Sequence, residues 1–109
     1  MFANMTHLKV APENGDKFVK VLAGEHLRPL LMDAPGFRYN FFMANSAEPG
    51  EYYSITFWDS PEQAQAFFGG AGYAEITAEV VDLLLQTPIR WGLKVEEAID
   101  LKGLVTPAA

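Results

Sequence analysis

The spacing of hydrophobic residues changes several times along the chain, and each spacing predicts a different element. From Asp16 onward, apolar residues recur at intervals of three and four, which is typical of one face of an amphipathic helix. This stripe contains Val19, Leu22, Ala23, His26, Leu27 and Leu30. The turn residues Asp33–Gly36 end the helix. Pro29 is expected to kink or shorten the last turn, because proline has no N–H to donate.

Four other segments read as strands, because they are apolar or aromatic-rich and are bounded by turn residues. They are Phe2–Val10, Phe37–Asn45, Tyr52–Trp58 and Ile89–Val95. In the last of them apolar and polar residues alternate strictly, which predicts a strand with one buried face. The middle two are expected to pair as a hairpin.

A second helical region follows the third strand. Ser60 is in place to cap a helix, with proline at its first position and Gln63 at its third. The run Gly69–Gly72 breaks this helix and is expected to form a flexible joint, since it lacks the Lys-Ser/Thr pair of a phosphate-binding loop. A helical stripe then resumes until Thr87-Pro88; it contains Tyr73, Ile76, Thr77, Val80 and Leu84, with Glu75, Glu79 and Asp82 on the outward side.

The order of elements is β-α-β-β-α-β, with no repeat and no linker. It predicts an α+β fold of the ferredoxin-like type, an antiparallel sheet with its helices on one face. One domain is expected over residues 1–96, and residues 97–109 form a C-terminal tail. This tail, which contains Leu101, Leu104 and Val105, either reaches across a dimer or is disordered.

Both faces of the predicted sheet carry large apolar side chains, although two helices can cover only one of them. Strand alternation places Tyr53, Ile55 and Phe57 opposite Tyr52 and Trp58, and places Phe37, Tyr39, Phe41 and Met43 opposite Phe42. An open apolar face of this kind is an association surface. We therefore expect a homodimer formed through the sheet.

Composition narrows the choice of function. The 109 residues are 50% hydrophobic and include no long apolar run, which indicates a globular domain rather than a membrane span. The absence of cysteine excludes disulfides, thiolate metal sites and cysteine nucleophiles. A net charge of −6 argues against nucleic acid or an anionic bilayer as a partner. The first ten residues do not resemble a signal peptide, so a cytoplasmic location is expected.

Several short motifs resemble the antibiotic biosynthesis monooxygenase domain of the dimeric α/β-barrel superfamily. They are Ala34-Pro35-Gly36-Phe37, Phe57-Trp58-Asp59-Ser60-Pro61-Glu62, the Phe67/Phe68 helix, the restart at Tyr73 and the last strand. The likeness covers about residues 2 to 96. It implies the fold more strongly than the chemistry, because this domain hosts polyketide and quinol monooxygenases, haem-degrading enzymes and isomerases.

Residue by residue, Trp58 matches the tryptophan that ends the third strand in the polyketide oxygenases and in the haem-degrading branch. The polyketide oxygenases have an asparagine four residues earlier, where this chain has Ser54. The haem-degrading branch has an iron-ligating histidine shortly after the position of Tyr73, and this chain has none there. The asparagine that this branch has on its first strand corresponds to Asn4 or, in another alignment, to Thr6.

The resemblance implies chemistry that needs no metal or flavin. An electron-rich aromatic is bound in an apolar pocket and deprotonated, and its carbanion reacts with dioxygen. Trp58 would stack on the ring and donate its indole N–H, or else it fills the core at the end of the sheet. His26 would serve as the base, or else it is a hydrogen-bonded core residue.

Other polar residues are open to both a functional and a structural interpretation. Arg38, Arg90 and Lys94 would meet an anionic substrate or pair with carboxylates across strands. Hydrogen bonds to a quinone oxygen would come from Asn40, Tyr39, Tyr53 or Tyr73, unless these groups satisfy buried backbone. His7 and His26 lie on different elements without a third nitrogen or sulfur ligand, so a histidine-based metal site is not expected.

The sequence thus predicts a homodimeric, cofactor-independent monooxygenase that acts on a phenolic or quinol-type aromatic. Its predicted catalytic residues are His26 and Trp58, and its predicted substrate-binding residues are Ser54, Asn4, Tyr73 and Arg38. The alternatives are a non-catalytic dimer that binds a small ligand or a partner protein, and an isomerase or lyase on the same fold. Haem degradation ranks below these, because the ligating histidine is missing.

Overall fold

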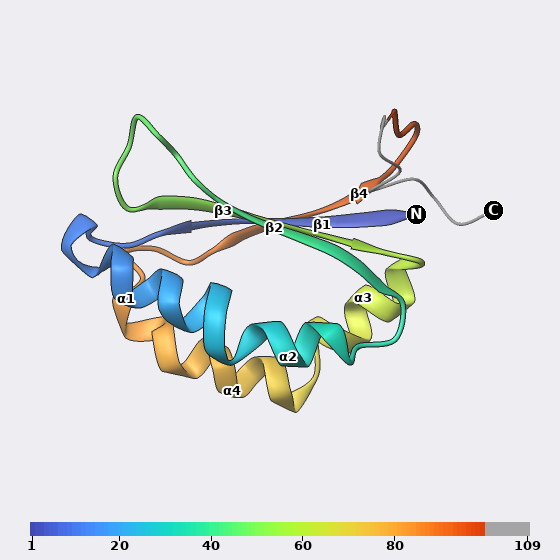
Figure 1. Cartoon of the computed structure of the whole chain (residues 1–109), viewed down its shortest axis with the longest axis horizontal. Helices are drawn as coiled ribbons and strands as arrows, with labels where there is room; N and C mark the ends of the chain where they lie inside the picture. Colours follow the sequence, from blue (N-terminus) through green and yellow to red (C-terminus); the bar gives the residue numbers. More distant parts are fainter. Residues whose placement is uncertain (100–109) are drawn as a thin grey trace.

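The fold consists of one antiparallel sheet and one layer of helices, as Figure 1 shows for the computed structural model. The structure describes residues 1–99, apart from the side chains of Ala23 and Glu25. The strands are β1 (Phe2–Lys9), β2 (Phe37–Ala44), β3 (Glu51–Trp58) and β4 (Ile89–Lys94), in the spatial order β2-β3-β1-β4. The predicted ferredoxin-like fold is confirmed. Most of the predicted tail, including Leu101, Leu104 and Val105, lies outside the described residues.

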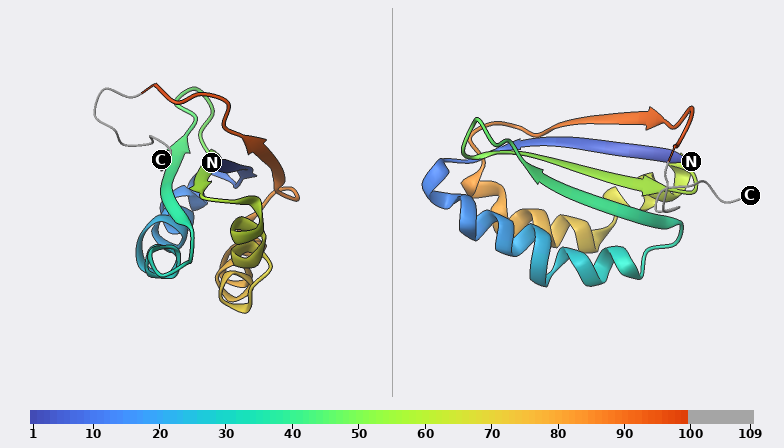
Figure 2. Two further views of the ribbon diagram at one scale, coloured as in Figure 1. Left: turned by 90° about the vertical axis from the view of Figure 1, so that its right-hand side faces the viewer. Right: turned by 45° about the horizontal axis from the view of Figure 1, so that its top comes forward.

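All the helices lie against one face of the sheet (Figures 1 and 2). The first helical region comprises a short 3₁₀ turn (Pro12–Asn14), α1 (Gly15–Lys20), a π-helical turn (Val21–Glu25) and α2 (Leu27–Met32). The second comprises α3 (Pro61–Phe68), α4 (Ala71–Val80) and a 3₁₀ turn (Val81–Leu83). As predicted, the Ser60 hydroxyl caps α3 by accepting a hydrogen bond from the Gln63 N–H. Leu84 leaves the predicted helical stripe and bridges Val10 instead.

The π-helical turn changes which residues of the first helical region face the sheet. The buried residues are Phe18, Leu22, Leu27 and Leu31, spaced four, five and four apart. The interval of five matches the π-helical turn, which accommodates one more residue than an α-helical turn. The predicted stripe assumed regular α-helix, and its assignment of His26 to the buried face is therefore wrong. His26 is exposed.

The helix-facing side of the sheet forms the core together with these leucines. Trp58 and Phe18 are completely buried, and the Trp58 ring packs against Phe37, Phe67 and Phe68. A register shift between Phe37 and Tyr39 turns Phe37 toward the helices, where it pairs with Trp58. The prediction that Phe37 shares a face with Tyr39 is therefore wrong, because strict alternation does not allow for a bulge.

The opposite face of the sheet remains apolar and open. Phe41, Met43, Ile89, Trp91 and Leu93 each expose between 38% and 47% of their surface there. The alternating pattern of β4 predicts that Ile89, Trp91 and Leu93 are buried. In the single chain, the face of the sheet on which they lie is open to solvent. The polar positions of β4 consequently face the helices, and this brings Arg90 beside a cavity.

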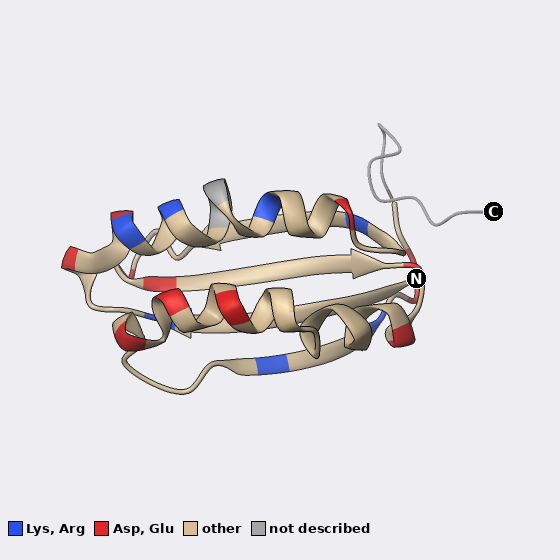
Figure 3. Ribbon diagram, turned by 90° about the horizontal axis from the view of Figure 1, so that it is seen from below, with Lys and Arg blue, Asp and Glu red and all other residues tan. Residues whose placement is uncertain are grey.

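The two helical regions differ in charge. Figure 3 shows both basic and acidic positions along the first helical region, whereas the charged positions of α4 are acidic. Glu75, Glu79 and Asp82 are exposed, as predicted. His26 joins the two regions, because its Nδ1 lies 2.8 Å from Oε2 of Glu79.

Candidate active-site cavity

A cavity of about 320 Å³ lies between the sheet and the helical layer. Aliphatic and aromatic side chains form most of its wall, among them Leu8, Leu22, Leu27, Leu31, Phe42, Phe67, Phe68 and Val80. Its size is at the lower end of the range for small-molecule sites, and an apolar wall with few polar groups is typical of them. It is therefore the candidate active site.

The polar groups of this cavity come from four elements. Thr6 lies on β1, Ser54 and Thr56 lie on β3, Tyr73 and Thr77 lie on α4, and Arg90 lies on β4. Thr6 pairs with both Ser54 and Arg90 across the sheet, so strand register brings these three side chains to one face. Hydroxyl groups and a guanidinium can donate hydrogen bonds to the oxygens of a bound aromatic.

Arg90 holds a defined position beside the cavity. Its Nε donates to Thr6 Oγ1 at 3.2 Å, and a terminal N–H donates to the Tyr73 hydroxyl at 2.8 Å. Its guanidinium carbon lies 4.5 Å from the centre of the Phe68 ring, within cation–π range. Arg90 thus connects the sheet to both α3 and α4.

Tyr73 is the titratable neighbour of this guanidinium. Burial raises the pKa of the Tyr73 phenol above its ordinary value, and the charge and hydrogen bond of Arg90 offset only part of that rise. Tyr73 therefore stays protonated near neutral pH. Its position follows from the sequence, because α4 begins directly after the glycines that end α3.

The structure does not place Trp58 on the cavity surface. Its indole Nε1–H donates to Thr56 Oγ1 at 2.8 Å, and aromatic rings surround it. Of the two interpretations of Trp58, the core-filling one matches this geometry. Thr56 itself lines the cavity, as do Phe67 and Phe68, so Trp58 lies directly behind three wall residues.

The other predicted site residues are divided between the cavity and the rest of the molecule. Ser54 and Tyr73 line the cavity, and the Ser54 hydroxyl donates to Asn40 Oδ1 at 3.2 Å. Asn4 is not among the lining residues, although its Oδ1 is buried without a hydrogen-bond partner. Of the two alignments considered for the first strand, Thr6 is the residue that reaches the cavity.

His26 and Arg38 lie away from the cavity. The His26 side chain is 48% exposed and contacts Glu79. Arg38 donates to Asp59 Oδ1 at 3.2 Å and lines a different hollow between α2 and β2.

Thr56 is a cavity residue that the sequence does not predict, since a threonine in a strand usually indicates only β-propensity. The sequence predicts Arg90 only as one of three basic strand residues. The alternation of β4 places it beside the cavity once the apolar side of that strand is known to be the open face.

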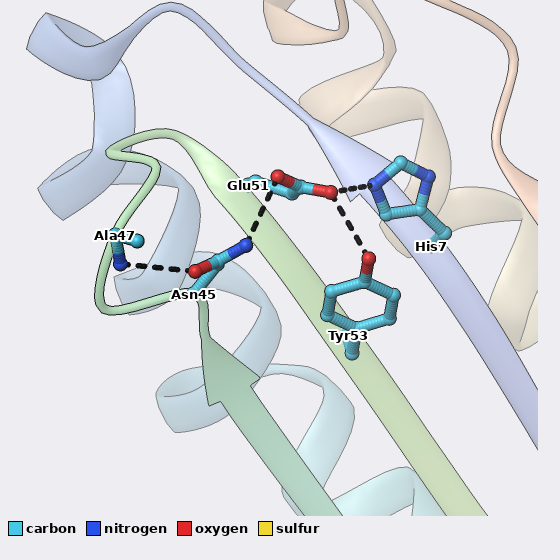
Figure 4. Close-up of polar contacts among 5 residues, drawn as sticks. All are labelled: His7, Asn45, Ala47, Glu51 and Tyr53. Atoms are coloured by element: carbon cyan, nitrogen blue, oxygen red, sulfur yellow. Dashed lines mark hydrogen bonds and ion pairs between the residues drawn. The ribbon is translucent and has the colours of Figure 1, made fainter.

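A second polar cluster lies on the open face of the sheet (Figure 4). The Glu51 carboxylate contacts His7 Nε2 at 2.8 Å and accepts hydrogen bonds from Tyr53 and Asn45 at 3.0 and 3.2 Å. These bonds lower the pKa of Glu51, with the largest effect from the Tyr53 hydroxyl. The Tyr53 pKa rises in turn, chiefly because its hydroxyl bonds to that carboxylate. This cluster does not line the cavity.

Within residues 1–99, no three His, Asp or Glu side chains come together in a way that could hold a metal ion. No helix in the same range combines the length and the apolar character needed to cross a membrane.

Comparison with solved structures finds the same fold at low sequence identity. A monooxygenase from the gene ActVA-Orf6 of Streptomyces coelicolor, in complex with the ligand nanaomycin D, is 22% identical, with a TM-score of 0.77 over 90% of this chain and 89% of that one. Rv0793 from Mycobacterium tuberculosis is 16% identical (TM-score 0.76; 91% and 98% covered). NE2512 from Nitrosomonas europaea, a protein of unknown function, is 19% identical (TM-score 0.76; 90% and 91% covered).

Comparison at the sequence level is more specific. No curated protein matches this chain. The model of the family described as antibiotic biosynthesis monooxygenase matches residues 1–79, which include three of the four strands and most of the helical layer. The chain therefore belongs to the antibiotic biosynthesis monooxygenase family.

Proposed function

We propose that this protein is a cofactor-independent monooxygenase that oxidises a phenolic or quinol-type aromatic with dioxygen. The observation that carries the proposal is the cavity under the sheet, which has a mainly apolar wall and hydrogen-bond donors from Thr6, Tyr73 and Arg90. Membership in a monooxygenase family supports the same reaction class.

The reaction needs an electron-rich carbon and a place for the charge that develops on the substrate oxygen. The aromatic ring packs against the leucines and Phe42, and its oxygen lies within reach of Arg90 and Tyr73. These donors stabilise the anion that forms when the substrate loses a proton. The carbanion of an anthrone then forms a C–O bond to dioxygen, and the peroxide takes up a proton. Loss of water leaves a new carbonyl, so one oxygen atom enters the product and the other leaves as water.

The predicted site residues enter this proposal with different roles. Ser54 and Tyr73 bind the substrate. Trp58 acts as a positioning residue, because its N–H fixes Thr56 and its ring supports Phe67 and Phe68. Base catalysis by His26 and substrate binding by Asn4 and Arg38 stay predictions from the sequence, to be tested by substitution.

Oxygen consumption with anthrone and 1,4-dihydroxynaphthalene tests the proposal. We expect wild-type protein to consume oxygen above the rate of spontaneous oxidation, and Tyr73→Phe to lower kcat about tenfold through loss of one hydrogen bond to a charged group. Because His26 lies outside the cavity, His26→Ala tests whether it nevertheless acts as the base: a loss of kcat would support that role, and unchanged activity would contradict it. Met32→Ala, which changes an exposed residue of α2 outside the cavity, is the control. Absence of oxygen uptake across the panel would contradict the proposal.

A second candidate function is non-catalytic binding of a small aromatic ligand. It is favoured by the chemistry of the lining, because none of the described residues around the cavity is a carboxylate or an imidazole. Ligand-dependent thermal stabilisation without oxygen uptake would identify this function. An isomerase or lyase would instead convert its substrate without consuming oxygen.

A further inference from the structure

A second space in the molecule borders the candidate active-site cavity. It is a hollow of about 300 Å³ between the end of α2 and the joint between α3 and α4, and we call it the joint hollow. Its wall includes Leu30, Ala34, Pro35 and Ala66, and two further lining residues are glycines. A wall of this kind suits an aliphatic group rather than a charged one.

Two aromatic rings separate the joint hollow from the cavity. Among the described residues, only Phe67 and Tyr73 line both spaces. Their ring centres lie 5.5 Å apart, which is a typical distance for an aromatic pair. A ligand in the cavity whose substituent points toward α2 therefore meets these rings before the substituent reaches the joint hollow.

The two rings are held in different ways. The Tyr73 hydroxyl accepts a hydrogen bond from Arg90, so this ring belongs to the polar part of the cavity. The Phe67 ring contacts three other rings at centre distances between 5.2 and 5.5 Å, those of Trp58, Phe68 and Tyr73. Truncation of Phe67 leaves no donor or acceptor unpaired, because its side chain has no polar group. Phe67 is therefore the ring whose removal joins the two spaces and keeps the polar groups in place.

We propose that Phe67 is a specificity-determining residue, which limits the length of the substituent that an aromatic ligand of the cavity can carry toward α2. The inference rests on the cavity being the ligand site of the proposed function, and it adds a limit on shape. Compact aromatics fit. An aromatic with a flexible aliphatic chain buries only the part of the chain that ends in front of Phe67.

The expected effect follows from the burial of methylene groups. Each methylene that moves from water to an apolar wall strengthens binding about fourfold, and a methylene that stays in water adds nothing. In the wild type, affinity should therefore stop rising once the chain reaches the Phe67 ring. With that ring truncated, a longer chain continues into the joint hollow and affinity should keep rising.

A series of naphthyl ethers tests this limit. The methyl, butyl and hexyl ethers of 1-naphthol have the same ring system and differ only in chain length, and the fluorescence of the naphthalene reports their binding. We expect Phe67→Ala to bind the hexyl ether more tightly than the wild type does. The ratio of the two affinities should rise at least about tenfold from the methyl to the hexyl ether.

Three results would overturn the proposal. The first is an affinity ratio that does not change with chain length. The second is a wild type whose affinity still rises about fourfold per methylene up to the hexyl ether. The third is a failure of all three ethers to bind to either protein, because the cavity would then not be the ligand site.

Phe68→Ala is the matched control. Phe68 is the next residue of α3, and its ring contacts the same Trp58 and Tyr73 rings. It lines the cavity and does not line the joint hollow. Phe68→Ala therefore enlarges the cavity without joining the two spaces, and it should not reproduce the gain with chain length. An equal gain in both variants would show that cavity volume, rather than the partition at Phe67, sets the limit.

A second substitution locates the chain. Ala66 lines the joint hollow and does not line the cavity, so Ala66→Leu partly fills the hollow. Added to Phe67→Ala, it should remove most of the gain for the hexyl ether. A gain that persists in the double variant would place the chain elsewhere and contradict the proposal.

Phe67→Leu covers the case in which the alanine variant does not fold, because leucine keeps more of the packing against Trp58. It should change the affinity ratio in the same direction by a smaller factor. Circular dichroism establishes that each variant is folded.

The outcome is separable from that of the proposed function. Length selection that depends on Phe67, without oxygen uptake by the anthrone panel, would support the partition and contradict the monooxygenase. Oxygen uptake without length selection would support the monooxygenase and overturn the partition.

Discussion

Glu51 is a residue whose surroundings define a pH dependence. Three side chains donate hydrogen bonds to its carboxylate, and the contact with His7 requires a proton on Nε2 of that ring. The pKa of Glu51 is lowered below its ordinary value of 4.5, first by the bond from Tyr53 and then by that from His7. The folded state therefore holds the charged carboxylate more strongly than the unfolded state does.

A carboxyl group whose pKa is lower in the folded than in the unfolded state stabilises the fold at any pH above its unfolded-state pKa. This stabilisation is lost as the pH falls through the folded-state pKa. Compared with Glu51→Gln, the wild type is expected to be more stable at pH 7, and this difference should shrink as the pH falls below about 4.5. Urea denaturation of both proteins between pH 7 and pH 3 measures it. Glu48→Gln, in the adjacent loop, is the control. A difference that is constant over this range would contradict the assignment.

At the scale of elements, periodicity determined the type and order of the segments but not the local irregularities. The helix start at Ser60 was predictable because its capping residues act locally. The π-helical turn was not, because Val21–Glu25 has no sequence signature and the turn becomes favourable only when Leu27 and Leu31 meet the sheet. The bulge beside Phe37 likewise depends on pairing with Trp58. These two departures account for the misplacement of His26 and Phe37.

Residues of the candidate site were predictable to the extent that their elements were regular. Tyr73 and Ser54 lie where the predicted helix restart and strand place them. Arg90 required knowledge of which face of β4 meets the helices, and its strand pattern alone fits either orientation. Trp58 was correctly expected near the end of the sheet, and its hydrogen bond to Thr56 became visible only in three dimensions.

Replacing a glycine by alanine is expected to have opposite effects on stability in a helical turn and in a turn with positive φ. Gly24 lies within the π-helical turn, and a Cβ added there would meet no atom within 4 Å. Gly24→Ala is therefore expected to stabilise the protein by about 0.5–1 kcal/mol, because alanine loses less backbone entropy on folding. Thermal or urea denaturation measures the change. Destabilisation would mean that the π-helical turn itself requires glycine.

At Gly50 the same substitution is expected to destabilise the protein, and the same denaturation experiment measures it. Its φ of +91° disfavours a side chain, and a Cβ there would overlap the backbone oxygen of Val10. Gly50→Ala is therefore expected to cost about 1–3 kcal/mol or more. An equal effect of alanine at both positions would contradict this account of the turn between β2 and β3.

For the whole molecule, the open face of the sheet is the main unexplained surface. The helices cover one side (Figure 2), and the other side exposes Phe41, Met43, Ile89, Trp91 and Leu93. Contiguous apolar patches of this kind mark interaction surfaces. A second copy is the occupant predicted from the sequence, and two such faces would bury each other's apolar side chains.

We therefore expect sedimentation velocity at micromolar concentration to give about twice the 12.1 kDa chain mass. Trp91→Glu places a carboxylate on this face, where dimer formation would bury it without a partner. Such burial costs several kcal/mol, so the dimer dissociation constant should rise at least about 30-fold. Met32→Glu adds the same charge at an exposed residue of α2, on the helical side of the molecule, and should leave the dimer intact. A wild type that sediments at the monomer mass would contradict the dimer, and equal weakening by both substitutions would show that net charge, rather than this face, controls association.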